Sequence, residues 1–123
     1  MPLPIQENLS ERSFEFCCAA YDYCEALVQL RGLAARVGYQ LWDAASSVGA
    51  NGAESRSAYS DKEFASKNAI CLKEARESLF WLRVAEKKNL GDPMRRRYLL
   101  RESNQLVSIY VTIVKNLQDK LRD

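Results

Sequence analysis

The chain has no histidine, and among its 123 residues it has only 5 glycines and 3 prolines. Without imidazole, a Cys/His zinc site and a Glu-x-x-His di-iron site are excluded, and a cysteine nucleophile would lack its usual base. No apolar run reaches the roughly 18 residues that a membrane helix needs, and the first residues lack the basic and apolar regions of a secretion signal. We therefore expect no metal ion, no cofactor, no membrane partner and a cytoplasmic location.

The cysteines also lack the spacing of a metal or redox site. They include no C-x-x-C pair, which such sites commonly use. In a cytoplasmic protein, free cysteines usually act as small core residues. We interpret all four as reduced, buried side chains: Cys17, Cys18, Cys24 and Cys71.

Charge is nearly balanced over the whole chain but unevenly distributed along it. The formal net charge is +2, too small to identify a nucleic-acid surface by itself. Acidic residues predominate in residues 1–59, whereas basic residues predominate in residues 86–123. The apolar content of 47% is typical of one folded domain of this length.

Apolar residues recur at helical spacing in several segments, which predicts an all-α fold. Ser60 and Glu63 have the spacing of a capping box, and Asp92 before Pro93 is a second helix-start signal. We expect an extended N-terminal arm over residues 1–11 and a bundle over 12–123, with helices over about 13–31, 34–57, 61–89 and 93–121. Short connections between four helices favour an antiparallel up-down four-helix bundle.

The second predicted helix contains an unusual run of small residues over 44–53. Gly49 and Gly52 are unfavourable in a helix interior, so they could mark its end. Alternatively, their small size could let another helix approach closely while this helix continues to about residue 57. The residues alone leave both interpretations open.

A set of short motifs resembles one family across most of the chain. The motifs are Arg12-Ser13-Phe14-Glu15-Phe16, Gln40-Leu41, Ser47-Val48-Gly49-Ala50-Asn51, Glu54, Ala58, Ser60, Phe64, Lys67, Leu72-Lys73-Glu74-Ala75-Arg76-Glu77 and Trp81-Leu82. Their order and spacing resemble the bacterial four-helix-bundle proteins encoded in intervening sequences of 23S ribosomal RNA genes. The resemblance implies that the second helix continues through both glycines, and that the protein forms a homopentameric ring.

A related branch includes the accessory proteins of diversity-generating retroelements, which are basic rings that bind nucleic acid and a reverse transcriptase. RNA or DNA and a reverse transcriptase are therefore partners that the resemblance implies. The chain departs from the family where basic residues are frequent on the second helix, since it has Asp43 and Ala53 there. These departures weaken a nucleic-acid role for that face.

Polar residues shared with the family suggest a site between the second and third helices. They could bind a ligand or partner, or they could form a structural polar layer that fixes helix register. We favour the polar layer, because no nucleophile or imidazole accompanies them. Within it we expect Glu54 to pair with Lys67; the five residues are Asn51, Glu54, Lys67, Glu74 and Glu77.

The strongest basic cluster lies at the junction of the third and fourth helices. Its residues could contact phosphates of RNA or DNA, or they could merely solvate the start of the fourth helix. A ring would repeat the cluster and raise its avidity for a polyanion. The candidate residues are Lys87, Lys88, Arg95, Arg96, Arg97 and Arg101.

Large aromatic residues on the second and third helices have two interpretations. A stacking platform for bases is one. Burial in the core or at a subunit interface is the one we favour. The residues are Tyr39, Trp42, Phe80 and Trp81.

Together these observations predict a non-enzymatic, homo-oligomeric helical bundle with an accessory role in binding RNA or DNA. The alternative is a protein-interaction or structural module without nucleic-acid affinity.

Overall fold

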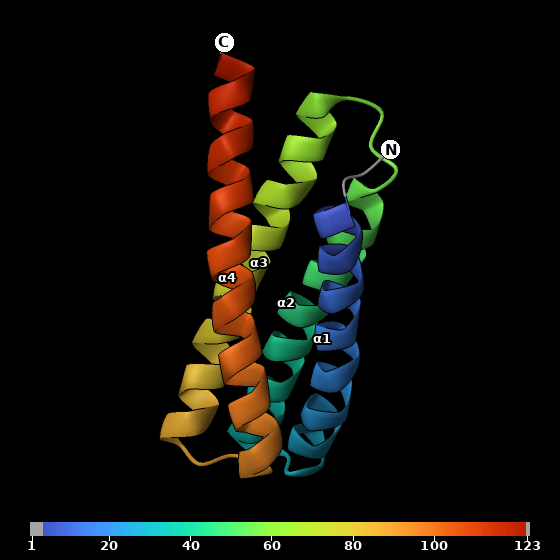
Figure 1. Cartoon of the computed structure of the whole chain (residues 1–123). Helices are drawn as coiled ribbons and strands as arrows, with labels where there is room; N and C mark the ends of the chain where they lie inside the picture. Colours follow the sequence, from blue (N-terminus) through green and yellow to red (C-terminus); the bar gives the residue numbers. More distant parts are fainter. Residues whose placement is uncertain (1–3, 123) are drawn as a thin grey trace.

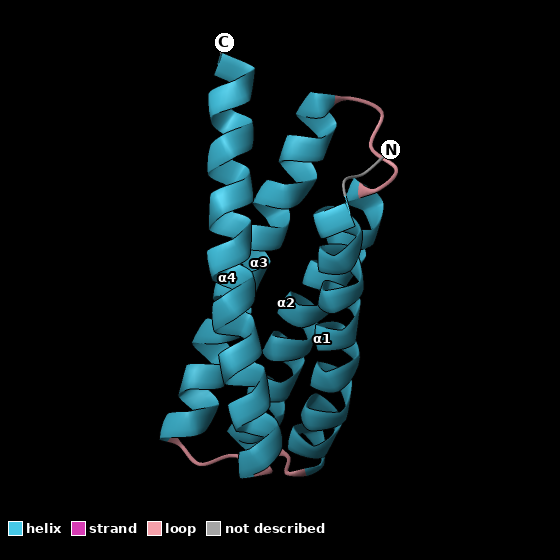
Figure 2. Ribbon diagram, viewed as in Figure 1, coloured by secondary structure: helices cyan, strands magenta, loops and turns pink. Residues whose placement is uncertain are grey.

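The computed structural model describes residues 4–122, with side chains from residue 8 onward, and all of its regular structure is helical. The helices are α1 (Pro4–Gln29), α2 (Gly32–Ser55), α3 (Asp61–Lys87) and α4 (Pro93–Arg122) (Figure 2). Each helix packs along the next one in the chain, and α4 closes against α1 through a smaller interface. The α1–α2 and α3–α4 turns lie at one end and the α2–α3 loop at the other (Figure 1). The predicted antiparallel four-helix bundle is confirmed.

The predicted N-terminal arm is wrong for residues 4–11, which belong to α1. Leu9 and Ser10 are buried, so apolar contact with the bundle extends the helix beyond the predicted start near residue 13. Pro4 is the first residue of α1, and proline is tolerated in the first turn because its missing N–H would have no helical partner. Residues 1–3 of the predicted arm lie outside the described residues.

The predicted helix starts have the expected caps. The Ser60 hydroxyl accepts from the Glu63 amide at 3.0 Å, and Glu63 reaches back to the Tyr59 amide, one residue earlier than the cap amide that we expected. A carboxylate oxygen of Asp92 accepts from the Arg95 amide at 2.7 Å. Both caps satisfy N–H groups that the first helical turn leaves without partners.

The small residues of α2 serve close packing against α1. The helix continues through Gly49 and Gly52, as the family resemblance implies, and ends at Ser55, two residues before the predicted end. A Cβ atom on Gly49 would lie 2.9 Å from the Cβ of Cys17, closer than real Cβ contacts. At Gly52 the hydroxyls of Ser13 and Tyr110 lie nearby and are 2.7 Å apart, so three helices meet there.

The core runs through the bundle and includes contributions from every helix. Its large fully buried side chains are Phe16, Tyr23, Leu27, Leu41, Val48, Cys71, Leu82, Leu99, Leu106 and Tyr110. Within residues 4–122, no helix is both long and apolar enough to cross a membrane.

Candidate nucleic-acid interface and polar seam

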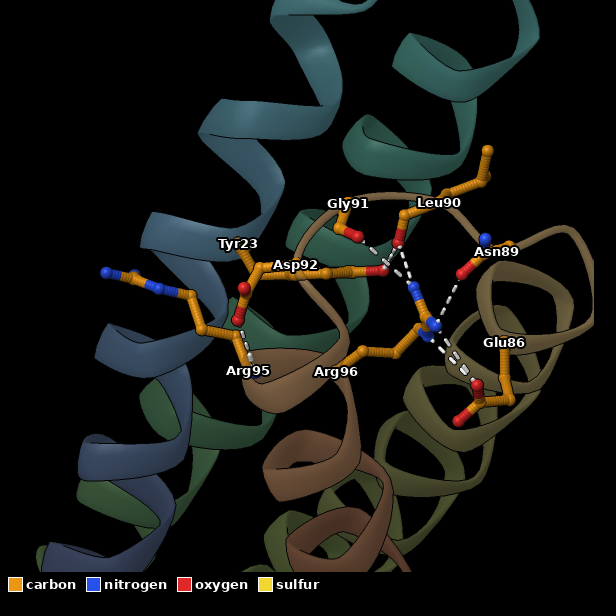
Figure 3. A network of polar contacts seen from close by, with 8 residues as sticks. All are labelled: Tyr23, Glu86, Asn89, Leu90, Gly91, Asp92, Arg95 and Arg96. Atoms are coloured by element: carbon orange, nitrogen blue, oxygen red, sulfur yellow. Dashed lines mark hydrogen bonds and ion pairs between the residues drawn. The ribbon is translucent and has the colours of Figure 1, made fainter.

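Arg96 lies inside the bundle, where it organises the turn between α3 and α4 (Figure 3). Its side chain is only 3% exposed. Its guanidinium donates to the carbonyls of Leu90 and Gly91 at 2.6 and 3.3 Å, to Oε1 of Glu86 at 3.1 Å and to Oδ1 of Asn89 at 3.0 Å. The prediction that Arg96 contacts nucleic acid is therefore corrected, because every direction of its donor fork is already used by the protein.

Tyr23 ties α1 to the same turn. Its hydroxyl donates to the Leu90 carbonyl at 2.5 Å, so this carbonyl accepts from both Tyr23 and Arg96. Gly91 adopts a φ of +70°, and a Cβ there would lie 2.8 Å from the Tyr23 ring. The turn is thus fixed from two sides.

Arg95 points away from Arg96 and toward α1 (Figure 3). Its guanidinium lies 3.7 Å from a carboxylate oxygen of Asp22, and both side chains are more than half exposed. An exposed pair of this kind contributes little to stability, roughly 0–1 kcal/mol. Arg95 is accessible but lies beside a carboxylate that competes with phosphate.

Besides Arg95, four of the six predicted basic residues are exposed at this end of the bundle: Lys87, Lys88, Arg97 and Arg101. Arg97 and Arg101 are one helical turn apart on α4. Lys87 and Lys88 line an open cleft of about 580 Å³ between α3 and α4. None of the four forms an ion pair among the described side chains.

The cleft itself combines an apolar floor with a charged rim. Phe80, Val84 and Leu100 provide the apolar surface, and Arg83 adds a further cation beside the two lysines. Glu86 also lines it, although its carboxylate is bonded to Arg96. The arrangement is suited to an anionic partner that also offers apolar or aromatic surface.

The polar residues of α2 and α3 form a seam along the boundary between these helices. Lys67 Nζ lies 2.7 Å from Oε2 of Glu54, which confirms the predicted pair, and this bond raises the pKa of Lys67. Asn51 donates to the carbonyl and hydroxyl of Ser47 at 2.9 and 3.0 Å. Glu54 is exposed, so the seam is partly open to solvent rather than a fully buried layer.

Glu74 and Glu77 are one turn apart in the same seam. Burial raises the pKa of Glu74, and the neighbouring Glu77 carboxyl raises it further. Oε1 of Glu74 is buried without a hydrogen-bond partner among the described residues. Neither carboxyl lines the cavities around Phe80, Ala19, Ser10 and Tyr21.

The predicted aromatic residues divide between packed and exposed positions. Trp42 packs edge-on against Tyr21, with ring centroids 5.4 Å apart, and Trp81 packs in the same way against Phe80 at 4.9 Å. Both tryptophans pack against the core, whereas Tyr39 and Phe80 are 58% and 53% exposed. Packing against the core is therefore confirmed for the two tryptophans, which are partly buried, and not for Tyr39 and Phe80.

The four cysteines differ in burial. Burial raises the pKa of Cys24 to about 12 and that of Cys71 to about 11, so both thiols are protonated at neutral pH. Cys17 is half-buried and Cys18 is exposed, so the expectation of four buried thiols is wrong for these two. Within residues 4–122, no group of His, Cys, Asp or Glu has the arrangement of a metal site.

Comparisons with known proteins are consistent with this architecture. No curated protein matches the sequence. The chain is similar to a solved structure from Bacteroides thetaiotaomicron, a protein of unknown function from the S23 ribosomal protein family. The two are 25% identical, with a TM-score of 0.77 over 87% of this chain and 98% of that one. The model of the 23S rRNA-intervening sequence protein family matches residues 7–112, and the chain therefore belongs to this family.

Proposed function

We propose that this protein is a non-catalytic homo-oligomer, a pentamer as the family resemblance implies, that binds the phosphate backbone of structured RNA. The observation that carries the proposal is the exposed set of Lys87, Lys88, Arg97 and Arg101, whose charges have no partner among the described side chains. Phosphate contacts supply most of the affinity in such complexes and need no base-specific geometry.

Oligomerisation strengthens this interpretation. One copy offers four such cations, which give weak binding at physiological salt. A ring repeats them around its axis, so a folded RNA can contact several copies at once and gain avidity. A non-catalytic role is supported by the absence of histidine and by the protonated state of the buried thiols Cys24 and Cys71.

A titration of RNA binding against salt tests the proposal. Fluorescence anisotropy with a structured RNA and with duplex DNA of equal length should show affinity that falls as salt rises. Arg97→Ala/Arg101→Ala should weaken binding and reduce the salt slope by about 0.9 for each phosphate that the protein no longer neutralises. Stronger binding of RNA than DNA would identify RNA as the partner; equal binding would indicate general phosphate recognition.

The matched control removes two cations from the other end of α4. Lys115 and Lys120 are exposed, so Lys115→Ala/Lys120→Ala removes the same amount of charge and should retain nearly full affinity. No binding at low salt, or equal weakening by both pairs of substitutions, would overturn the proposal.

A second candidate is a protein-interaction module without nucleic-acid affinity. It is favoured by the engagement of Arg95 and Arg96 within the protein, which leaves the basic cluster smaller than the sequence indicates. A reverse transcriptase is the partner that the retroelement resemblance implies, and co-purification of the protein with such an enzyme from its own operon would test this.

A further inference from the structure

The outer face of α1 carries acidic and aromatic side chains. From residue 8 to the end of α1, every exposed charged side chain is acidic, and the single basic residue, Arg12, is half-buried against Glu102. Phe14 and Tyr21 lie among the acidic residues and are 52% and 51% exposed. We call this surface the acidic stripe; its residues are Glu11, Phe14, Glu15, Cys18, Tyr21, Asp22 and Glu25.

The outer face of α3 has the opposite charge. A row of exposed residues recurs there at spacings of three or four and includes four cations, no carboxylate, and one aromatic ring, Phe80, that is 53% exposed. None of these cations forms an ion pair among the described side chains. We call this surface the basic stripe; its residues are Lys62, Ser66, Ala69, Lys73, Arg76, Phe80 and Arg83.

The two stripes lie on opposite sides of one molecule. Helices α1 and α3 each pack against α2 and α4 but not against each other, so they occupy diagonal corners of the bundle. Their outer faces therefore point in opposite directions, and the two helices run in the same direction (Figure 1). An acidic stripe and a basic stripe on opposite sides cannot neutralise each other within one chain.

The stripes also lie at the same height along the bundle. On α2, Gly49 contacts Cys17 of α1, and the adjacent Val48 carbonyl accepts from Cys71 of α3, which places these two cysteines level with each other. Near the other end, Tyr23 of α1 bonds to Leu90, just beyond α3. The acidic stripe is therefore level with the central and C-terminal parts of the basic stripe.

We propose that the acidic stripe of one copy docks in parallel on the basic stripe of a second copy. The inference rests on the proposed oligomerisation and names its interface. Every copy offers both surfaces at one height and in one direction, so the contact is head-to-tail. Directly opposite faces would give a straight row, so closure into a ring requires each contact to turn the next copy by a fixed angle about an axis along the bundle. Charge complementarity fixes the register, while Phe14, Tyr21 and Phe80 provide the apolar contacts.

Charge reversal tests the interface. Reversing one stripe should disrupt the contact, and reversing both stripes in the same chain should restore it. One variant carries Glu11→Lys, Glu15→Lys and Glu25→Lys, a second carries Lys73→Glu, Arg76→Glu and Arg83→Glu, and a third carries all six. Each single-stripe variant presents like charges at every contact, so its subunit dissociation constant should rise about a hundredfold or more. The six-site variant restores opposite charges and should return to the wild-type mass in light scattering.

A matched control and a folding check separate docking from misfolding. Arg36→Glu/Lys115→Glu reverses two exposed charges off both stripes and should leave the assembly intact. Helical circular dichroism should be equal in all variants, since none of the six sites is in the core. Rescue by the six-site variant supports the proposal even where a single-stripe variant is less stable.

The outcomes distinguish this inference from the proposed function. A wild-type oligomer that neither single-stripe variant dissociates would overturn the docking surface and leave oligomerisation standing. Loss of RNA binding without loss of assembly in the basic-stripe variant would also overturn it, by identifying α3 as an RNA surface. A monomeric wild-type chain would overturn both proposals.

Discussion

The Nη2 atom of Arg96 lies 3.1 Å from Oε1 of Glu86, so the first turn of α4 is bonded directly to the last turn of α3. The Arg96 side chain is almost completely buried, whereas that of Glu86 is 43% exposed. The ion pair is thus open to water on its acidic side, and the same guanidinium also satisfies two backbone carbonyls of the turn. Arg96 is therefore the side chain that bonds α4 to both α3 and the turn between them.

Replacing this side chain should destabilise the fold. Arg96→Met keeps most of the apolar stem but leaves the Gly91 carbonyl and the Glu86 carboxylate without their donor. We expect the free energy of unfolding to fall by about 1–3 kcal/mol, the cost of leaving buried polar groups of the turn without a hydrogen-bond donor. Urea denaturation measures it, and Arg97→Met, on the exposed neighbour, should change it by less than about 0.5 kcal/mol.

The distinction between Arg96 and its neighbours shows where sequence reasoning reaches its limit. Arg95, Arg96 and Arg97 are consecutive and carry the same charge, so charge alone does not distinguish the buried arginine from the two exposed ones. A usable signal exists, because Arg96 precedes Leu99 by three residues and Ser103 by seven, which places it on the buried side of α4. Helical periodicity identifies that face, but only the packed α3–α4 turn supplies the acceptors that offset the cost of burying a guanidinium.

Side-chain contacts between segments that are far apart in the sequence could not be predicted from the sequence. Arg12 forms two bonds of 2.7 Å to Glu102 and a third, short bond to Gln105, joining α1 to α4 across 90 residues. No local pattern links these positions. By contrast, the helix starts at Ser60 and Asp92 follow from local capping chemistry, and the Glu54–Lys67 pair follows from polar positions that the chain shares with the family it resembles.

Because α1 and α2 approach closely at Gly49, we expect the stability of the protein to fall steeply as the side chain at this position becomes larger. Gly49→Ala would place a methyl group 2.9 Å from the Cβ of Cys17, so the helices must separate or shift. Although alanine is the better helix former, we expect a loss of about 1–3 kcal/mol, typical of overpacking. Thermal unfolding measures the loss. The matched control is Ala50→Gly, one residue later and exposed, which should cost about 1 kcal/mol through helix propensity alone.

Burial also predicts the order in which the thiols react. Cys18 is exposed, whereas Cys24 and Cys71 are buried and their pKa values are raised to about 12 and about 11. At pH 8, a small alkylating reagent should modify Cys18 first and leave Cys24 and Cys71 unmodified until the protein unfolds. Peptide mass spectrometry of alkylated protein measures this order. Equal labelling of Cys24 and Cys18 in the folded state would contradict the packing of α1 against α2.

Glu74 provides a pH-dependent prediction whose sign follows from its raised pKa. Burial and the adjacent Glu77 carboxyl disfavour the charged form of Glu74, so the folded protein binds this proton more tightly than the unfolded chain does. The resulting penalty is absent below the ordinary pKa of glutamate, grows between that pKa and the raised one, and is greatest above the raised pKa. Glu74→Gln should therefore increase the free energy of unfolding at pH 7, by about 1 kcal/mol, the scale of one poorly satisfied buried polar group.

The same substitution should have almost no effect at pH 3.5, where Glu74 is protonated in both states. Glu63→Gln is the matched control: the amide oxygen can still accept from the Tyr59 amide, but the negative charge in the first turn of α3 is lost, so the protein should be slightly weakened rather than stabilised at neutral pH. Urea denaturation at the two pH values measures both variants. A stabilisation by Glu74→Gln that is equal at pH 3.5 and pH 7 would show that packing of the amide, rather than removal of a disfavoured charge, is responsible.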